Sequence, residues 1–330
     1  MHWQFADVLD GGPVARKLII DADPGIGDAL AVIMAACNPA VDLLAVTATA
    51  GSVSGEQATR NLLALISLLD PPRWPRFGVS DGSVAAWSAI DLPSPTAFHG
   101  PHGLGDFPAL DVQLHQRHDS AKVMIDLVRS HPHEVALLTL GPLTNVFRAS
   151  ELYPPFLSEL QSLVCQGGAY ASPGDVTPTA EFNIQADPEA ARYVLRQPCT
   201  KTLVPLDVTQ RVVLTFDQFQ RLSPGPETRF GQILSWMLPF ALRAARQHLG
   251  TEGITLPEVV ALAAITHPEL FERESGAVDV ELHGELTRGM TVFDRRGIAS
   301  WQQNIDVLTR ADHQGILDQF CRQAQSQLRG

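Results

Sequence analysis

The chain reads Lys-Leu-Ile-Ile-Asp-Ala-Asp-Pro-Gly-Ile-Gly-Asp-Ala over residues 17–29, and this stretch decides the fold. It opens with an apolar run at residues 18–20, turns through one proline and two glycines, and continues into an apolar segment with helical character at residues 29–36. A short apolar run that turns sharply into a helix is typical of a buried strand in a parallel sheet. We therefore expect an α/β fold that begins with this strand.

Three aspartates follow the expected strand: Asp21, Asp23 and Asp28. In an extended chain Asp21 and Asp23 point to the same side, and Asp28 lies in the first turn of the helix, so we expect the three carboxylates to gather where ligands of open α/β sheets bind. No Lys or Arg occurs between Lys17 and Arg60 to neutralise them. A bound cation is the simplest remedy, and oxygen ligands favour Ca²⁺ or Mg²⁺ over softer metals.

Other interpretations of this turn are open from these residues alone. Asp21 or Asp23 can cap the helix while Asp28 is solvated, although two carboxylates exceed what one cap requires. A dinucleotide-binding turn fits less well, because Leu30 occupies the third glycine position and acidic side chains repel a pyrophosphate. A phosphatase with Asp21 as nucleophile fits the Asp-x-Asp pattern, but it needs a lysine for the phosphoryl group. The chain has only three lysines: Lys17, Lys122 and Lys201.

Length and composition limit the class of protein. With 330 residues and 45% hydrophobic content, the chain can bury a large core, and we expect one domain over residues 1–330. A net charge of −12 argues against nucleic acid or an anionic membrane as partner. The four cysteines are scattered without C-x-x-C spacing, which predicts reduced thiols and a cytoplasmic location. No stretch reaches the roughly 20 apolar residues of a membrane span, and residues 1–12 do not resemble a signal peptide.

Strand and helix patterns alternate along most of the chain, which predicts an open, mostly parallel, Rossmann-like sheet flanked by helices. Strands are expected at residues 18–20, 42–49, 135–140, 163–165 and 202–205, with a further pair at 277–282 and 290–293. The main helices are expected at residues 29–36, 54–69, 120–129, 230–247, 258–266 and 312–328. Residues 71–105 form a long loop rich in Pro, Gly and Ser, and such loops are often functional.

The turn at residues 21–29 resembles the amino-terminal signature of the nucleoside hydrolases, the inosine-uridine-preferring N-ribohydrolases, which usually read Asp-x-Asp-Pro-Gly-x-Asp-Asp-Ala. Other segments resemble family motifs in the family's order. Residues 138–145, Leu-Thr-Leu-Gly-Pro-Leu-Thr-Asn, are similar to the second motif, and residues 176–190 resemble the segment that grips the ribose. Residues 205–209 and 286–289 also resemble family landmarks. The chain is thus identified as a divergent member of this family.

The resemblance implies Ca²⁺-dependent hydrolysis of the N-glycosidic bond of a nucleoside, giving ribose and a free base. It implies that Ca²⁺ is held by Asp23, Asp28, the backbone carbonyl of Leu140, and Glu258. Asp23 would also act as the general base, and His99 is the first candidate for protonating the leaving base. The expected substrate contacts are Ser52, Asp175, Glu181, Asn183, His102 and His248. Because relatives are usually dimers or tetramers, we expect a homodimer or homotetramer.

Several positions depart from the family pattern. Gly27 stands where the family usually has the second aspartate of its pair, which contacts the ribose 2'-hydroxyl, and Ser52 replaces an asparagine on the same side of the sugar. Asp175 replaces another asparagine in the substrate loop. Pro257 removes a histidine that can protonate a leaving base, and Glu258 is one methylene longer than the usual aspartate.

These departures motivate two expectations. The protein should discriminate less sharply than typical relatives between ribonucleosides and deoxy- or 2'-modified nucleosides. The alternative is a catalytically weak or inactive relative that binds a sugar or nucleoside. Some candidate residues also have structural interpretations, since Glu181 and Asn183 suit helix entry, Asp175 suits a turn, and each histidine suits a solvated position.

Overall fold

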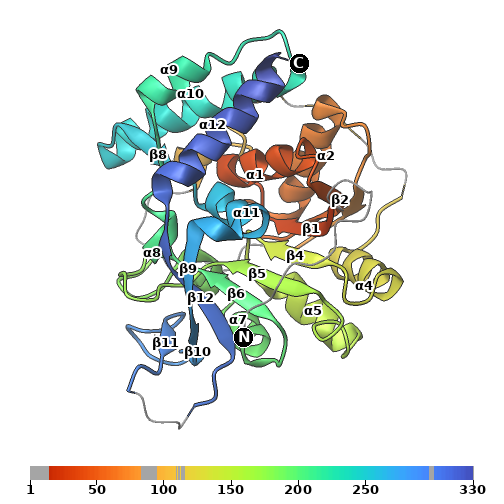
Figure 1. Cartoon of the computed structure of the whole chain (residues 1–330), viewed down its shortest axis with the longest axis vertical. Coiled ribbons are helices and arrows are strands. Elements are labelled where there is room, and N and C mark those ends of the chain that lie inside the picture. Colours follow the sequence, from red (N-terminus) through yellow and green to blue (C-terminus); the bar gives the residue numbers. More distant parts are fainter. Residues whose placement is uncertain are drawn as a thin grey trace.

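The computed structural model describes residues 15–82, 95–108, 110, 112, 116–296 and 301–329. Its main sheet contains β1 (Arg16–Ala22), β2 (Val41–Ala48), β3 (Arg76–Gly78), β4 (Ala136–Thr139), β5 (Ser162–Gln166), β6 (Lys201–Val204), β9 (Phe271–Gly276) and β12 (Ile305–Ala311). The eight strands have the order β3-β2-β1-β4-β5-β6-β12-β9. Figure 1 shows the run from β2 through β1, β4 and β5 to β6. Neighbours pair in parallel except at the edge, where β9 runs antiparallel to β12. The predicted open, mostly parallel sheet is therefore confirmed.

Helices cover both faces of this sheet (Figure 1). One face carries α1 (Ile26–Ala36), α2 (Gly55–Leu69), α10 (Arg229–Leu249), α11 (Pro257–Thr266) and α12 (His313–Arg329). The other carries α4 (Ser120–Ser130), α5 (Thr144–Leu152) and α7 (Pro188–Arg196). Successive side chains of a strand point to opposite faces, so Leu18 and Ile20 pack in the first core and Ile19 in the second. This two-sided burial explains why the first strand is apolar throughout.

Shorter elements connect these layers. They are α3 (Pro95–His99), α6 (Phe182–Ala186), α8 (Leu206–Thr209), α9 (Phe216–Leu222), a 3₁₀ turn (Pro268–Leu270), and the antiparallel pairs β7 (Val213–Thr215) with β8 (Gly253–Thr255) and β10 (Val278–Val280) with β11 (Thr291–Phe293). The β10–β11 pair confirms the strand pair expected near residues 277–293.

The strand order places the binding edge of the sheet. The order β3-β2-β1-β4-β5-β6 is that of the Rossmann fold, and it reverses between β1 and β4. In such sheets a crevice forms at the carboxyl ends of the strands beside the reversal. Asp23 follows β1 and Leu140 follows β4, so the topology brings these two positions to the crevice. Strands β1 and β12, from opposite ends of the chain, share the sheet.

The sequence interpretation misses β9 and β12 of the main sheet, the short pair β7 and β8, and some regular structure in the long loop. It assigns no strand to β9, which is mostly exposed at the sheet edge, or to β12, whose apolar residues are interrupted by charged ones. The expected loop at residues 71–105 contains β3 and α3, while its residues 83–94 lie outside the described part. Three-residue strands and five-residue helices are too short to show a periodic pattern.

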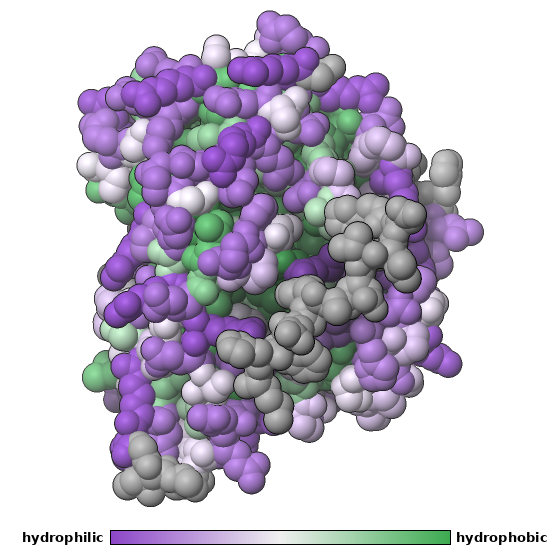
Figure 2. Space-filling model, in the orientation of Figure 1, coloured by the Kyte–Doolittle hydropathy of each residue, from purple (hydrophilic) through white to green (hydrophobic). Residues whose placement is uncertain are grey.

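One face of the molecule is shown as a space-filling surface in Figure 2. In Figure 2 most of the face seen in Figure 1 is hydrophilic, and hydrophobic residues show mainly in its recesses. Within the described ranges, no helix combines the length and apolarity needed to cross a membrane.

Candidate functional site

A pocket of about 300 Å³ gathers most of the predicted site residues. It is lined by Asp23, Asp28, Ser52, His99, Leu140, Asp175, Glu181, Asn183 and Glu258, together with Phe98, Gln166, Val176, Phe182, Leu249 and Pro257. The described lining includes no Lys or Arg. His102 and His248 do not line this pocket, and both are exposed. His248 instead stacks edge-on against Phe98, with ring centroids 5.5 Å apart.

Asp23 is the most tightly enclosed carboxylate of the pocket. It is 1% exposed, and the backbone N–H of Ser52 donates a hydrogen bond to its Oδ2. A Cβ added to Gly51 would lie 3.0 Å from the Asp23 Cβ and closer still to Oδ2. A Cβ added to Gly141 would lie 3.0 Å from the Asp23 Cγ and closer still to Oδ1. Two glycines on separate loops therefore make room for this one carboxylate, a contact that no local sequence signal reveals.

Asp28 and Glu258 lie in the first turns of α1 and α11. Asp28 is 4% exposed, and its Oδ2 accepts a hydrogen bond from the Gly25 N–H at 3.2 Å. Within the described structure, Asp28 Oδ1 and Glu258 Oε2 are buried without a hydrogen-bond partner. A buried acceptor without a partner is costly, so these oxygens are suited to a ligand.

The pKa values reflect this unbalanced negative charge. Burial raises the pKa of Asp28 to about 6. Burial, reinforced by the charge of Asp28, raises the pKa of Glu258 to about 8. The same two causes raise the pKa of Asp23 well above its ordinary value, against the lowering effect of the hydrogen bonds from Ser52. A cation is the one partner that would favour all three ionised forms at once.

The donor set of this region fits a hard cation. Leu140 offers its backbone carbonyl, which accepts one hydrogen bond from Asn183 Nδ2 at 2.7 Å and keeps its second lone pair. With Asp23, Asp28 and Glu258, it forms an all-oxygen set of the kind that Ca²⁺ prefers. As the side chains stand, no three Asp, Glu, His or Cys residues in the described ranges are arranged to hold an ion. The oxygen donors are of the type that suits Ca²⁺, and the side chains of Asp23, Asp28 and Glu258 would have to move closer together to bind it.

Glu181 both lines the pocket and caps a helix. Its Oε2 accepts hydrogen bonds from the backbone N–H groups of Gly168 at 2.9 Å and Ile184 at 3.1 Å, and the second of these caps α6. Burial, with the charge of Asp175, raises the pKa of Glu181 to about 8. The capping interpretation is therefore confirmed for Glu181, and it does not remove the side chain from the pocket.

Asn183 and Asp175 line the same pocket as Glu181. The Nδ2 group of Asn183 donates to the carbonyls of Leu140 and Gln166, which leaves its Oδ1 as the group available to a ligand. Asp175 Oδ1 accepts from the Phe182 N–H at 2.9 Å, and burial raises the pKa of Asp175 to about 6.

His99 approaches the pocket from α3. Its Nδ1 accepts a hydrogen bond from the Ile26 N–H at 3.2 Å, so the proton of the neutral ring resides on Nε2. Burial lowers the pKa of His99 to about 4, which keeps the ring neutral near pH 7. A Cβ on Gly25 would lie 2.9 Å from Nδ1, so the helix entry is shaped to receive this ring.

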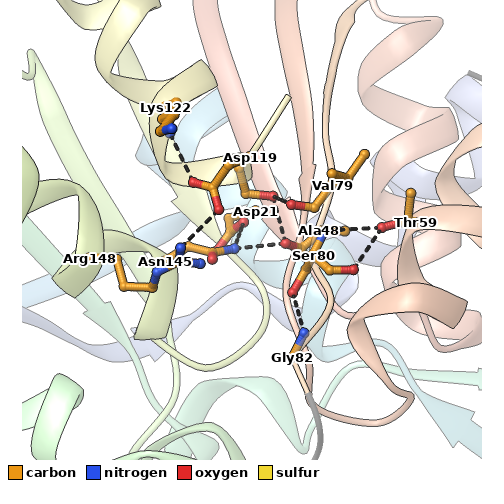
Figure 3. Close-up of polar contacts among 11 residues, drawn as sticks. Asp21, Ala48, Thr59, Val79, Ser80, Gly82, Asp119, Lys122, Asn145 and Arg148 are labelled. Carbon is orange, nitrogen blue, oxygen red and sulfur yellow. Dashed lines mark hydrogen bonds and ion pairs between the residues drawn. The ribbon is translucent and has the colours of Figure 1, made fainter. Parts of the chain in front are cut away.

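Asp21 is not part of the pocket, and the expectation that it joins Asp23 and Asp28 is wrong. It is fully buried, with Oδ1 accepting from Thr47 Oγ1 at 2.6 Å and Asn145 Nδ2 at 2.9 Å. Asn145 Nδ2 also donates to the Ala48 carbonyl at 2.7 Å, so Asp21 ties β1 to β2 and α5 (Figure 3). A nucleophile needs access to its substrate, so the phosphatase interpretation based on Asp21 is also wrong.

Known proteins resemble this chain along most of its length. A model of the family described as inosine-uridine preferring nucleoside hydrolase matches residues 18–318. Uridine nucleosidase 1 of Arabidopsis thaliana is 34% identical over 313 residues, which cover 92% of this chain and 91% of that protein. Non-specific ribonucleoside hydrolase RihC of Salmonella paratyphi C is 34% identical over 307 residues, which cover 91% and 94%.

Solved structures show the same likeness. The purine-preferring ribonucleoside hydrolase from Gardnerella vaginalis has a TM-score of 0.85 at 28% identity, covering 95% of this chain and 99% of that one. A plant nucleoside hydrolase, PpNRh1, has a TM-score of 0.84 at 27% identity, with 94% and 99% covered. From its Asp-x-Asp turn to its last helix, the chain belongs to the inosine-uridine preferring nucleoside hydrolase family.

Proposed function

We propose that this protein is a Ca²⁺-dependent nucleoside N-ribohydrolase, which uses water to split a nucleoside into ribose and a free base. Family membership supports the reaction class. The observation that carries the proposal is the meeting of Asp23, Asp28 and Glu258 with His99 in one pocket at the carboxyl ends of the strands.

Asp23, Asp28, Glu258 and the Leu140 carbonyl are the residues that we assign to Ca²⁺. The bound ion supplies positive charge for activating water and for holding the ribose diol. The unpartnered oxygens of Asp28 and Glu258 support this assignment, because both belong to pocket-lining residues.

Asp23 is the residue that we assign as general base. As water attacks the anomeric carbon, a carboxylate oxygen of Asp23 takes the proton, while the C–N bond breaks with its electron pair going to the base. The Ser52 N–H bonds the carboxylate, and Gly51 and Gly141 pack closely against it, so its orientation is fixed before the reaction. Little conformational entropy of this side chain is then lost in the transition state.

His99 is the residue that we assign to the leaving base. Since Ile26 occupies Nδ1, the Nε2–H group is the one that donates a hydrogen bond to a base nitrogen or oxygen as negative charge develops there. On the sugar side, Glu181, Asn183 Oδ1, Asp175 and Ser52 are the candidate partners of the ribose hydroxyls. His102 and His248, which are exposed, remain candidates only for contacts outside the described pocket.

We also propose that the enzyme works in the cytoplasm as a homodimer or homotetramer. The cytoplasmic assignment is based on four cysteines without disulfide bonds, which suits a reducing compartment. The oligomeric assignment is based on resemblance to the family, and sedimentation analysis of the purified protein tests it.

The decisive experiment measures base release. Purified protein with Ca²⁺ is incubated with a panel of ribonucleosides, 2'-deoxynucleosides and modified nucleosides, and free base and reducing sugar are quantified beside an Asp23→Asn control. Release that requires both Asp23 and Ca²⁺ supports the proposal. Nucleoside binding without release would favour the alternative, a weak or inactive binding relative, for which the changes at Gly27, Ser52 and Pro257 are the motivating observation.

A further inference from the structure

Gly27 lies directly beneath the carboxylate of Glu258. A Cβ added to Gly27 would be 2.8 Å from Glu258 Oε1 and closer still to Cδ and Oε2. Real Cβ atoms do not approach other atoms this closely, and all three carboxylate atoms are affected together. The contact joins the second residue of α1 to the second residue of α11, two helices that begin side by side at the pocket.

The backbone does not explain this glycine. Gly27 lies within α1 and does not have a positive φ, so alanine would suit the local conformation better. A glycine inside a helix lowers helix stability unless another contact requires it. The Glu258 carboxylate is the group that occupies the space of a Cβ here, so a side chain at position 27 would make this carboxylate shift.

The length of the Glu258 side chain brings its carboxylate to the space left by Gly27. Its side chain extends across the start of α1, where its charge raises no conflict with the helix, because helix N-termini favour negative charge. Its Oε2 is buried without a partner in the described structure, so the carboxylate is placed by the space over Gly27 and not by a hydrogen bond at that oxygen.

We propose that Gly27 and Glu258 form one steric pair, in which the missing side chain at Gly27 sets how far the Glu258 carboxylate reaches toward Asp28. Gly27 is then a positioning residue for a ligand of the proposed Ca²⁺ site. Only the calcium part of this inference rests on the proposed function. The steric part concerns the fold itself.

A double-mutant cycle tests the pair with Gly27→Ala, Glu258→Asp and the double variant. Calcium affinity is measured by isothermal titration calorimetry of the chelator-treated protein. We expect Gly27→Ala to weaken Ca²⁺ binding at least about tenfold, because the added methyl displaces the carboxylate. In the Glu258→Asp background, where the shorter side chain withdraws from Gly27, the same alanine should change affinity by less than about threefold.

Urea unfolding in the presence of chelator gives a second readout that does not depend on calcium or on catalysis. Gly27→Ala should lower the unfolding midpoint in the Glu258 protein and leave it equal or higher in the Glu258→Asp protein, where helix propensity is the remaining effect. Gly276→Ala, in strand β9, is the control for a Gly→Ala change without a close contact, since its Cβ would meet nothing nearer than 3.5 Å.

The outcomes separate the two proposals. Equal shifts of the midpoint by Gly27→Ala in both backgrounds would overturn the steric pair, whatever the protein binds. A reversal of the shift with no measurable Ca²⁺ binding by the unsubstituted protein would uphold the pair and overturn the proposed calcium site. A tenfold loss of affinity confined to the Glu258 background supports both.

Discussion

The two walls of the pocket are built in different ways. The Asp23 wall is the end of the main sheet, where strand β1, the loop after β2 and the loop after β4 fix one almost fully buried carboxylate. The His99 wall is the five-residue α3, which contacts α10 through the Phe98–His248 ring pair at 5.5 Å. The segment after α3 adds a Phe107–Trp236 ring contact at 5.6 Å and a solvent-exposed Asp106–Arg243 ion pair to the same helix. The core thus holds Asp23, which we propose for the attack on the sugar, whereas a short surface element holds His99, which we propose for the leaving base.

The largest effect should come from the sheet wall. Asp23→Asn keeps the size of the side chain but cannot accept the proton, so we expect kcat to fall by about 10² to 10⁴-fold. Steady-state base release measures this, and circular dichroism with thermal melting checks that the fold is retained. A loss below tenfold would remove Asp23 from the role of general base.

Removal of calcium should lower the free energy of unfolding, because the proposed ion binds the folded protein. If Asp28 and Glu258 hold an ion that the unfolded chain does not bind, then Ca²⁺ at 100 times its Kd adds about 2.7 kcal/mol to the free energy of unfolding. Thermal melts with EGTA and then with excess Ca²⁺ measure the difference. Identical melting curves in the two conditions would contradict a shared site.

The His99 wall should give a smaller effect with a distinctive pH profile. We expect His99→Gln to lower kcat/KM by about 10- to 100-fold, depending on how good a leaving group the base is. Because the pKa of His99 is lowered to about 4, the ring is already neutral over the usual range. The ratio of wild-type to variant kcat/KM should therefore stay constant from about pH 5.5 to 8. A ratio that falls to one as pH rises through 6.5 would instead indicate an acid with an ordinary histidine pKa.

The smallest effect concerns the sugar 2'-position. With Gly27 and Ser52 in place of polar family residues, the ratio of kcat/KM for a ribonucleoside over its 2'-deoxy analogue should be about 2- to 10-fold lower than in a typical relative assayed beside it. Ser52→Asn should raise that ratio. An equal or greater preference for ribonucleosides in the unsubstituted protein would refute this expectation.

The pattern of apolar residues along the sequence predicts the individual strands and helices whose formation depends on neighbouring residues. The apolar run before Asp21 and the helix after Asp28 predict the first strand-turn-helix unit, and the alternation of elements predicts the parallel sheet. The resemblance to the nucleoside hydrolases predicts that residues as distant as Asp23 and Leu140 meet, and both line one pocket.

What the sequence does not predict depends on long-range packing. Asp21 turns into the sheet because Thr47 and Asn145 bind it, and neither partner is near it in the chain. The contact between Gly27 and Glu258 likewise joins two helices that only the tertiary fold brings together. Edge strand β9 lacks the apolar run of a central strand, so its pattern does not distinguish it from a loop.

The enclosure of Asp23 has a consequence for how this protein tolerates change. A Cβ at Gly51 would collide with Oδ2 of Asp23, and a Cβ at Gly141 would collide with Oδ1. Even alanine at either position would therefore displace the same carboxylate. In a saturation library selected for growth on a nucleoside as sole base source, these two codons should retain glycine alone, whereas Gly276, where a Cβ would make only ordinary van der Waals contacts, should accept small residues. The pocket thus depends on two positions whose contribution is empty volume, and a survey that ranks residues by their functional groups would overlook them.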